Sequence, residues 1–76
     1  MKEVIIFSTK TWPHCQPAKD YLASKGVSFV EKDIQADTDA RKELRALGSM
    51  SVPTIKIGDE VIVGFDQGRI DKILGL

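Results

Sequence analysis

Short apolar runs separated by polar segments divide this chain into a regular series of predicted elements. Residues 4–7 form a continuous, mostly β-branched apolar run, which predicts a strand buried on both faces. A helical stripe follows and Gly26 ends it; its members are Cys15, Ala18, Tyr21 and Leu22. Residues 27–30 have the pattern of a second strand. Strand, helix and strand in this order predict a βαβ unit with parallel strands and a right-handed crossover.

The middle of the chain predicts a second helix and a hairpin. The helix begins at residues 37–39, where carboxylates and a hydroxyl satisfy free N–H groups, and it ends at Gly48. Its apolar face consists of Ala40, Leu44 and Leu47. Residues 54–57 and 60–63 flank Gly58-Asp59, and two residues with glycine first fit a type II′ turn. These two strands should therefore be antiparallel.

A short last helix completes the series. Asp66 should cap it, and its apolar face consists of Ile70, Ile73 and Leu74. The predicted order is β-α-β-α-β-β-α, without repeats or linkers. It describes one domain over residues 1–76, with a mixed four-stranded sheet covered by three helices. This is an α/β architecture.

Composition narrows the classes of function. The 76 residues contain one Cys and one His, so an internal disulfide and a four-ligand zinc site are excluded. Lys+Arg and Asp+Glu both total 11, so no net charge favours nucleic acid or an anionic membrane. The first apolar run is too short for a signal peptide or a membrane span. We expect a cytoplasmic monomer that holds no metal and no tightly bound cofactor.

The candidate chemistry centres on Trp12-Pro13-His14-Cys15, between the first strand and the first helix. Free N–H groups and the helix macrodipole stabilise a thiolate at such a position. Replacing Trp12 by Cys would give a Cys-x-x-Cys pair, in which Cys15 is the inner, more covered sulfur. Each of three residues has two interpretations that stay open. Cys15 is either a reactive sulfur or a small buried hydrophobe, and His14 is either a base or a solvent-facing side chain. Trp12 is either a platform for a partner or a shield of the helix end.

Two further segments are candidates for binding. Ser51-Val52-Pro53-Thr54 opens a strand with a proline, which either only starts the strand or exposes the Val52 backbone to an extended peptide. Gly64-Phe65-Asp66 precedes the last helix. Asp66 and the following N–H groups suit a charged ligand terminus, although an N-cap role explains Asp66 without any ligand.

These motifs resemble those of glutaredoxins and similar small bacterial redoxins over essentially the whole chain. The matching segments are residues 7–15, 18–22, 25–27, Gly48, 51–54 and 63–66. They align Cys15 with the second cysteine of the family and Trp12 with the first. The resemblance implies the thioredoxin fold and a cis bond before Pro53 that faces the active-site loop.

The resemblance also implies thiol–disulfide exchange, with roles in redox homeostasis and electron transfer. Carried over to this sequence, Val52 would bind a peptide backbone and Asp66 the far end of glutathione, beside Trp12, Pro13, Pro53, Gly64 and Phe65. Lys10 lies one residue from a basic position of many members. The Gly64-Phe65 pair is more similar to redoxins that supply ribonucleotide reductase and are recharged by thioredoxin reductase. Glutathione, a protein thiol or disulfide, and a reductase of that kind are the expected partners.

The main departure from the family is Trp12. Single-cysteine glutaredoxins that bridge iron–sulfur clusters keep the first cysteine, so their cluster role does not transfer. Dithiol reduction needs two sulfurs, and this chain has one. One hypothesis is therefore a redoxin that exchanges through Cys15 alone, with His14 beside it. The other is a redox-inactive binding module for peptides or thiol ligands. A third explanation, that Trp12 replaces a cysteine or selenocysteine of a parent gene, can be tested on the coding DNA.

Overall fold

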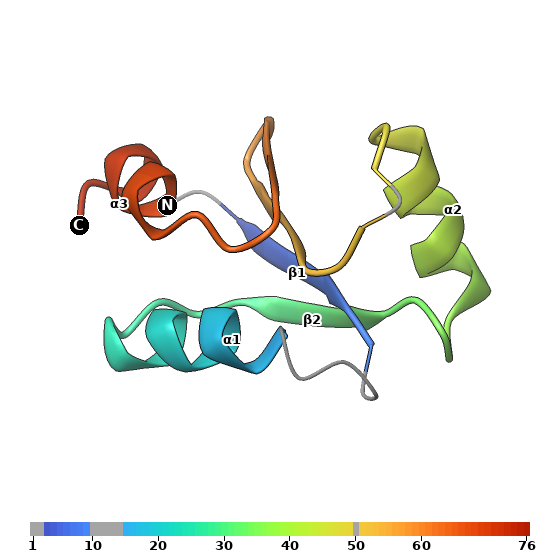
Figure 1. Cartoon of the computed structure of the whole chain (residues 1–76), viewed down its shortest axis with the longest axis horizontal. Helices are drawn as coiled ribbons and strands as arrows, with labels where there is room; N and C mark the ends of the chain where they lie inside the picture. Colours follow the sequence, from blue (N-terminus) through green and yellow to red (C-terminus); the bar gives the residue numbers. More distant parts are fainter. Residues whose placement is uncertain (1–2, 10–14, 50) are drawn as a thin grey trace.

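The predicted order of elements is confirmed. The structure, a computed structural model, describes residues 3–9, 15–49 and 51–76 (Figure 1). The strands are β1 (Val4–Ser8), β2 (Val30–Asp33), β3 (Thr54–Ile57) and β4 (Glu60–Val63), and the helices are α1 (Cys15–Ser24), α2 (Thr38–Ala46) and α3 (Gln67–Leu74). No helix in these three ranges is long and apolar enough to cross a membrane.

The strands form one mixed four-stranded sheet in the order β2-β1-β3-β4. β1 and β2 are parallel, as the βαβ unit predicts, and β3 is antiparallel to both β1 and β4. Gly58 has a φ of 59°, and no non-glycine residue in the described ranges has a positive φ. A type I′ turn would need positive φ at both central residues, so the turn fits the predicted type II′.

Helices cover both faces of the sheet. α1 and α3 lie on one face and α2 lies on the other (Figure 1). The core under α1 and α3 consists of Val4, Ile6, Ala18, Leu22, Ile55, Ile57, Ile62 and Ile70. The smaller core under α2 consists of Ile5, Phe7 and Leu44. Alternate residues of β1 thus enter different cores, which is why the whole strand is apolar and buried.

The second strand begins later than the sequence predicts. Residues 27–30 were expected, whereas β2 spans Val30–Asp33. The cause is the end of α1: Gly26 has a φ of 71°, and the Val27 N–H donates to the Leu22 carbonyl at 3.0 Å. This is a Schellman ending, which uses the N–H of Val27 and delays strand pairing. Val27 and Phe29 pack instead as connecting residues against the core under α1 and α3.

Both predicted aspartate caps are confirmed. The Asp37 side chain accepts hydrogen bonds from the N–H groups of Asp39 and Ala40, at 3.0 and 3.2 Å. The Asp66 side chain accepts one from the Arg69 N–H at 3.2 Å. These bonds satisfy donors that lack a partner within the helix, and they fix where α2 and α3 begin.

Candidate functional site

The three segments that the sequence singles out meet at one edge of the sheet. β1 ends at Ser8, and α1, which returns along the sheet in the βαβ crossover, begins at that edge with Cys15. β3 is antiparallel to β1 with Thr54 opposite Phe7, so it begins at the same edge. β4 pairs Val63 with Thr54, so it ends there. The start of α1, the start of β3 and the end of β4 are thereby brought together.

Cys15 is the first residue of α1, and it is buried. Its exposed fraction is 1%, and Ala18 and Leu22 are the other buried residues of α1. Pro17 lies in the first turn, where a missing N–H leaves no helical hydrogen bond unmade. The inner position predicted from the spacing is therefore what the structure shows. A sulfur so placed is near the free N–H groups of a helix start yet covered from an approaching disulfide.

Trp12, Pro13 and His14 lie outside the described residues. Their predicted roles, as platform, loop residue and base, stay predictions from the sequence.

The Val52–Pro53 peptide bond is cis, as the family resemblance implies. Pro53 is buried, and its carbonyl accepts a hydrogen bond from the Gly64 N–H at 2.8 Å. The Val52 side chain is half-buried against the core under α2. The hydrogen bond from Gly64 to Pro53 joins the second and third candidate segments, so the structure brings Val52, Pro53 and Gly64 together.

The third segment connects the site to α1. Phe65 is half-buried, and its ring lies 5.7 Å from the Tyr21 ring at an angle of 54°. The Tyr21 hydroxyl donates to the Asp71 carboxylate of α3. That hydrogen bond, together with partial burial and the Asp71 charge, raises the pKa of Tyr21 above its usual value. Asp66 is exposed, so its cap role leaves one face of the carboxylate accessible.

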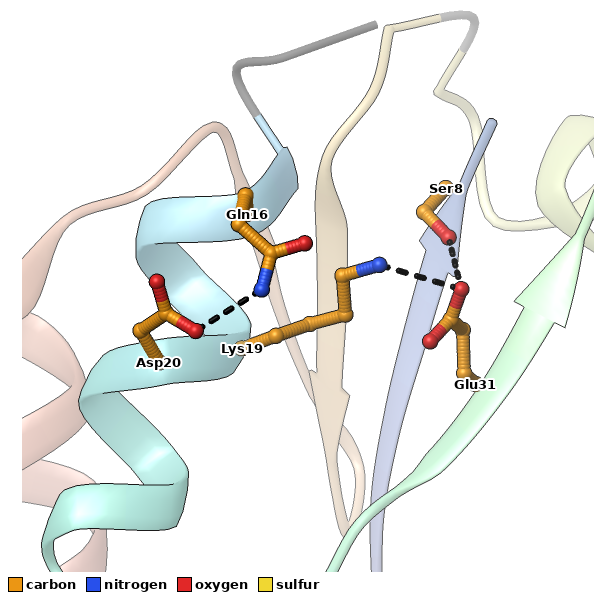
Figure 2. Close-up of polar contacts among 5 residues, drawn as sticks. All are labelled: Ser8, Gln16, Lys19, Asp20 and Glu31. Atoms are coloured by element: carbon orange, nitrogen blue, oxygen red, sulfur yellow. Dashed lines mark hydrogen bonds and ion pairs between the residues drawn. The ribbon is translucent and has the colours of Figure 1, made fainter. Parts of the chain in front are cut away.

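A polar network beside the site was not predicted from the sequence. Figure 2 shows Lys19 of α1 reaching Glu31 of β2, where Nζ lies 3.1 Å from Oε1. The Ser8 hydroxyl donates to the same oxygen at 3.3 Å. On the outer side of α1, Gln16 donates to Asp20 at 2.7 Å. The Lys19–Glu31 pair thus links α1 to β2, and the Ser8 hydroxyl links Glu31 to β1, whereas the Gln16–Asp20 bond stays within α1.

The sequence did not predict this network because it placed the end of the second strand too early. In the parallel register Glu31 lies beside Ile6, whose side chain faces α1. With a strand ending at residue 30, as the sequence suggested, Glu31 would have had no defined face. The correct boundary would have pointed Glu31 toward α1 and its lysine.

No metal centre is evident in the described ranges. They contain no group of three or more His, Cys, Asp or Glu side chains that could hold a metal ion.

Comparisons with known proteins agree with these features. The sequence profile of the family described as Glutaredoxin matches residues 4–62. A glutaredoxin-like 8.6 kDa protein of the rubredoxin operon of Clostridium pasteurianum is 43% identical over 70 residues, which cover 91% of this chain and 93% of that protein. Glutaredoxin 3 of Escherichia coli K12 is 40% identical over 82 residues, covering 97% of this chain and 99% of that one.

Solved structures support the same assignment. The glutaredoxin of Archaeoglobus fulgidus aligns with a TM-score of 0.82 at 26% identity, covering 97% of this chain and 87% of that one. A mutant of a thioredoxin-like protein aligns with a TM-score of 0.88 at 29% identity, covering 95% and 99%. The thioredoxin fold is thus confirmed. With a buried cysteine at the start of α1, a cis proline at the start of β3 and these relatives, the chain belongs to the glutaredoxin family.

Proposed function

We propose that this protein is a glutaredoxin-like redox protein that works with one sulfur, Cys15. The observation that supports this is the place of Cys15, which is the first residue of α1 and is 1% exposed. Burial requires a local opening before any disulfide can reach the sulfur. The expected activity is slow single-thiol exchange.

The proposed step is one exchange of disulfide bonds at Cys15. The Cys15 thiol gives its proton to water, its sulfur attacks one sulfur of oxidised glutathione or of a protein disulfide, a new S–S bond forms, and the old S–S bond breaks. The leaving thiolate takes a proton from water. A second thiol, from glutathione or a reductase-like donor, would reverse the step and restore Cys15. A reducing cytoplasm would keep Cys15 as a thiol between cycles.

A second candidate is a redox-inactive binding module. The burial of Cys15 favours it as well, because a core cysteine needs no chemistry to explain it. In that case the cis-proline loop would bind extended peptides, and Trp12 would supply an aromatic anchor.

Incubation with oxidised glutathione distinguishes the two. Intact-mass spectrometry would follow the mixed disulfide in native buffer and in concentrated urea, with Cys15→Ser as the variant that cannot react. Single-thiol exchange predicts a native adduct that forms faster than global unfolding allows. An adduct that forms only at the rate of global unfolding would rule out this redox role and leave the binding module.

A further inference from the structure

Two buried hydroxyl groups behind the Val52–Pro53 loop form a closed ring of hydrogen bonds with the main chain of Ser51. Ser49 is 4% exposed and Thr54 is 0% exposed. Thr54 Oγ1 donates to the Ser51 carbonyl at 2.6 Å. Ser49 Oγ lies 2.9 Å from Thr54 Oγ1, and the Ser51 N–H donates to Ser49 Oγ at 3.3 Å.

The direction of every bond in this ring follows from proton counting. A hydroxyl group has one proton to donate. Because the Thr54 proton goes to a carbonyl, which cannot donate, Ser49 must donate its own proton to Thr54 Oγ1. Both main-chain polar groups of Ser51 are therefore satisfied by side chains, and both hydroxyls are used in full.

The ring sets the direction of the neighbouring N–H group. Val52–Pro53 is the cis bond of the described chain, so the Ser51–Val52 peptide is trans and its N–H points away from its carbonyl. The Ser51 carbonyl points inward to Thr54, so the Val52 N–H points away from the buried hydroxyls. No hydrogen bond joins this N–H to any residue that the structure describes.

Val52 is held on its other sides as well. Its side chain packs against the core under α2. The next carbonyl, that of Pro53, is occupied by the Gly64 N–H. Of the polar main-chain groups in this turn, the Val52 N–H is thus a fixed donor that the described chain leaves unused.

We infer that Ser49 and Thr54 are positioning residues, which fix the Ser51–Val52 peptide plane so that the Val52 N–H can donate to the main chain of an extended thiol-bearing peptide. The inference rests on the proposed function for the class of ligand. A donor that is already oriented loses no conformational freedom on binding, so affinity is gained without new contacts.

The test uses the intact protein with S-methylglutathione, a tripeptide probe without a free thiol. Binding is followed by the amide signal of Val52 in nitrogen-15 NMR spectra. Thr54→Val keeps the shape of the side chain but removes the hydroxyl, so the probe's Kd should rise about 3- to 10-fold. Thr54→Ser should restore wild-type binding. Ile57→Val, at the far end of β3, loosens the core without touching the ring and should leave the Kd unchanged.

Ser49→Ala breaks the ring at a second point and provides the test if Thr54→Val does not fold. The inference is overturned if the wild-type Val52 signal does not respond to the probe, if both ring variants bind as tightly as wild type, or if Ile57→Val weakens binding equally. Failure of the redox proposal gives a different result. In that case Cys15 forms no mixed disulfide, while the Val52 signal still responds to the probe.

Discussion

Iodoacetamide should alkylate Cys15 about 100 times more slowly in the native protein than in the unfolded chain. The side chain is 1% exposed, so the reagent must wait for an opening of the structure. Two kinds of opening can expose the sulfur, and the one with the lower free energy determines the alkylation rate. The first is fraying of the first turn of α1, and the second is global unfolding.

The costs of these openings can be compared. Fraying exposes one small apolar side chain and breaks about two hydrogen bonds, which together contribute on the order of 3 kcal/mol. Global unfolding of 76 residues costs about 4–11 kcal/mol, at about 0.05–0.15 kcal/mol per residue. Because about 1.4 kcal/mol corresponds to a factor of ten, fraying slows the reaction about 10²-fold and unfolding at least about 10³-fold. Fraying should therefore dominate.

The assay is the rate of mass gain at one pH, in native buffer and in concentrated urea, corrected for the effect of urea on a free cysteine. Low urea separates the routes, because fraying exposes little surface and its rate should barely change. A rate that rises steeply with low urea would identify global unfolding as the only route. A native rate within about tenfold of the unfolded rate would contradict the burial argument itself.

Three other predictions follow from single substitutions. Trp12→Cys supplies a second sulfur and should turn on the reduction of insulin disulfides. Tyr21→Phe should lower Tm at neutral pH, and this Tm difference should vanish at high pH. The cause is the hydrogen bond from Tyr21 to Asp71, which raises the pKa of the tyrosine in the folded protein. The bond therefore stabilises the fold fully below the usual pKa of 10.0, and this stabilisation is lost as pH rises through the pKa of the folded protein. Asp66→Ala should lower the free energy of unfolding by about 1 kcal/mol and Tm by about 4–8 °C. It should also weaken S-methylglutathione binding, whereas Asp37→Ala should lower Tm without that effect.

Each of these has a result that would contradict it. A folded Trp12→Cys variant without reductase activity would mean that the scaffold lacks more than one sulfur; the matched control is the same variant with Cys15→Ser. An unchanged Tm difference at high pH would show that the hydrogen bond to Asp71 is not the cause of that difference. Equal probe binding by Asp66→Ala and Asp37→Ala would limit Asp66 to capping.

The elements that were predicted well are those whose boundaries depend on local chemistry. The hairpin positions were confirmed because Gly58 allows the turn and the flanking β-branched residues pair directly. Both helix starts were confirmed because an aspartate cap acts within three residues of itself. The position of Cys15 followed from helical spacing alone, since a residue three before Ala18 shares its face.

What was missed depends on strand register and on the path of a loop, which local residue patterns do not encode. The bond of Lys19 to Glu31 requires the register of β2, and the bond of Ser49 to Thr54 requires the path of the loop between them. Secondary-structure propensity carries neither kind of information, because a serine or lysine in such a position is just as often exposed to solvent. The late start of β2 had the same origin, since apolar residues 27–29 serve the core without joining the sheet.

The Trp12→Cys variant can separate the sulfur chemistry proposed for Cys15 from the peptide binding inferred for Val52. The proposed exchange depends on Cys15, the single cysteine of the chain, which is buried and reacts only after a local opening. The inferred peptide binding depends on the Val52 N–H and on the hydrogen bonds of Ser49 and Thr54, none of which involves the Cys15 sulfur. The two can therefore be measured independently: probe binding should be the same in wild type and Trp12→Cys unless the side chain of residue 12 itself contacts the peptide. A loss of binding in Trp12→Cys would show that the tryptophan has taken over part of the binding site, and it would favour the binding module over slow exchange.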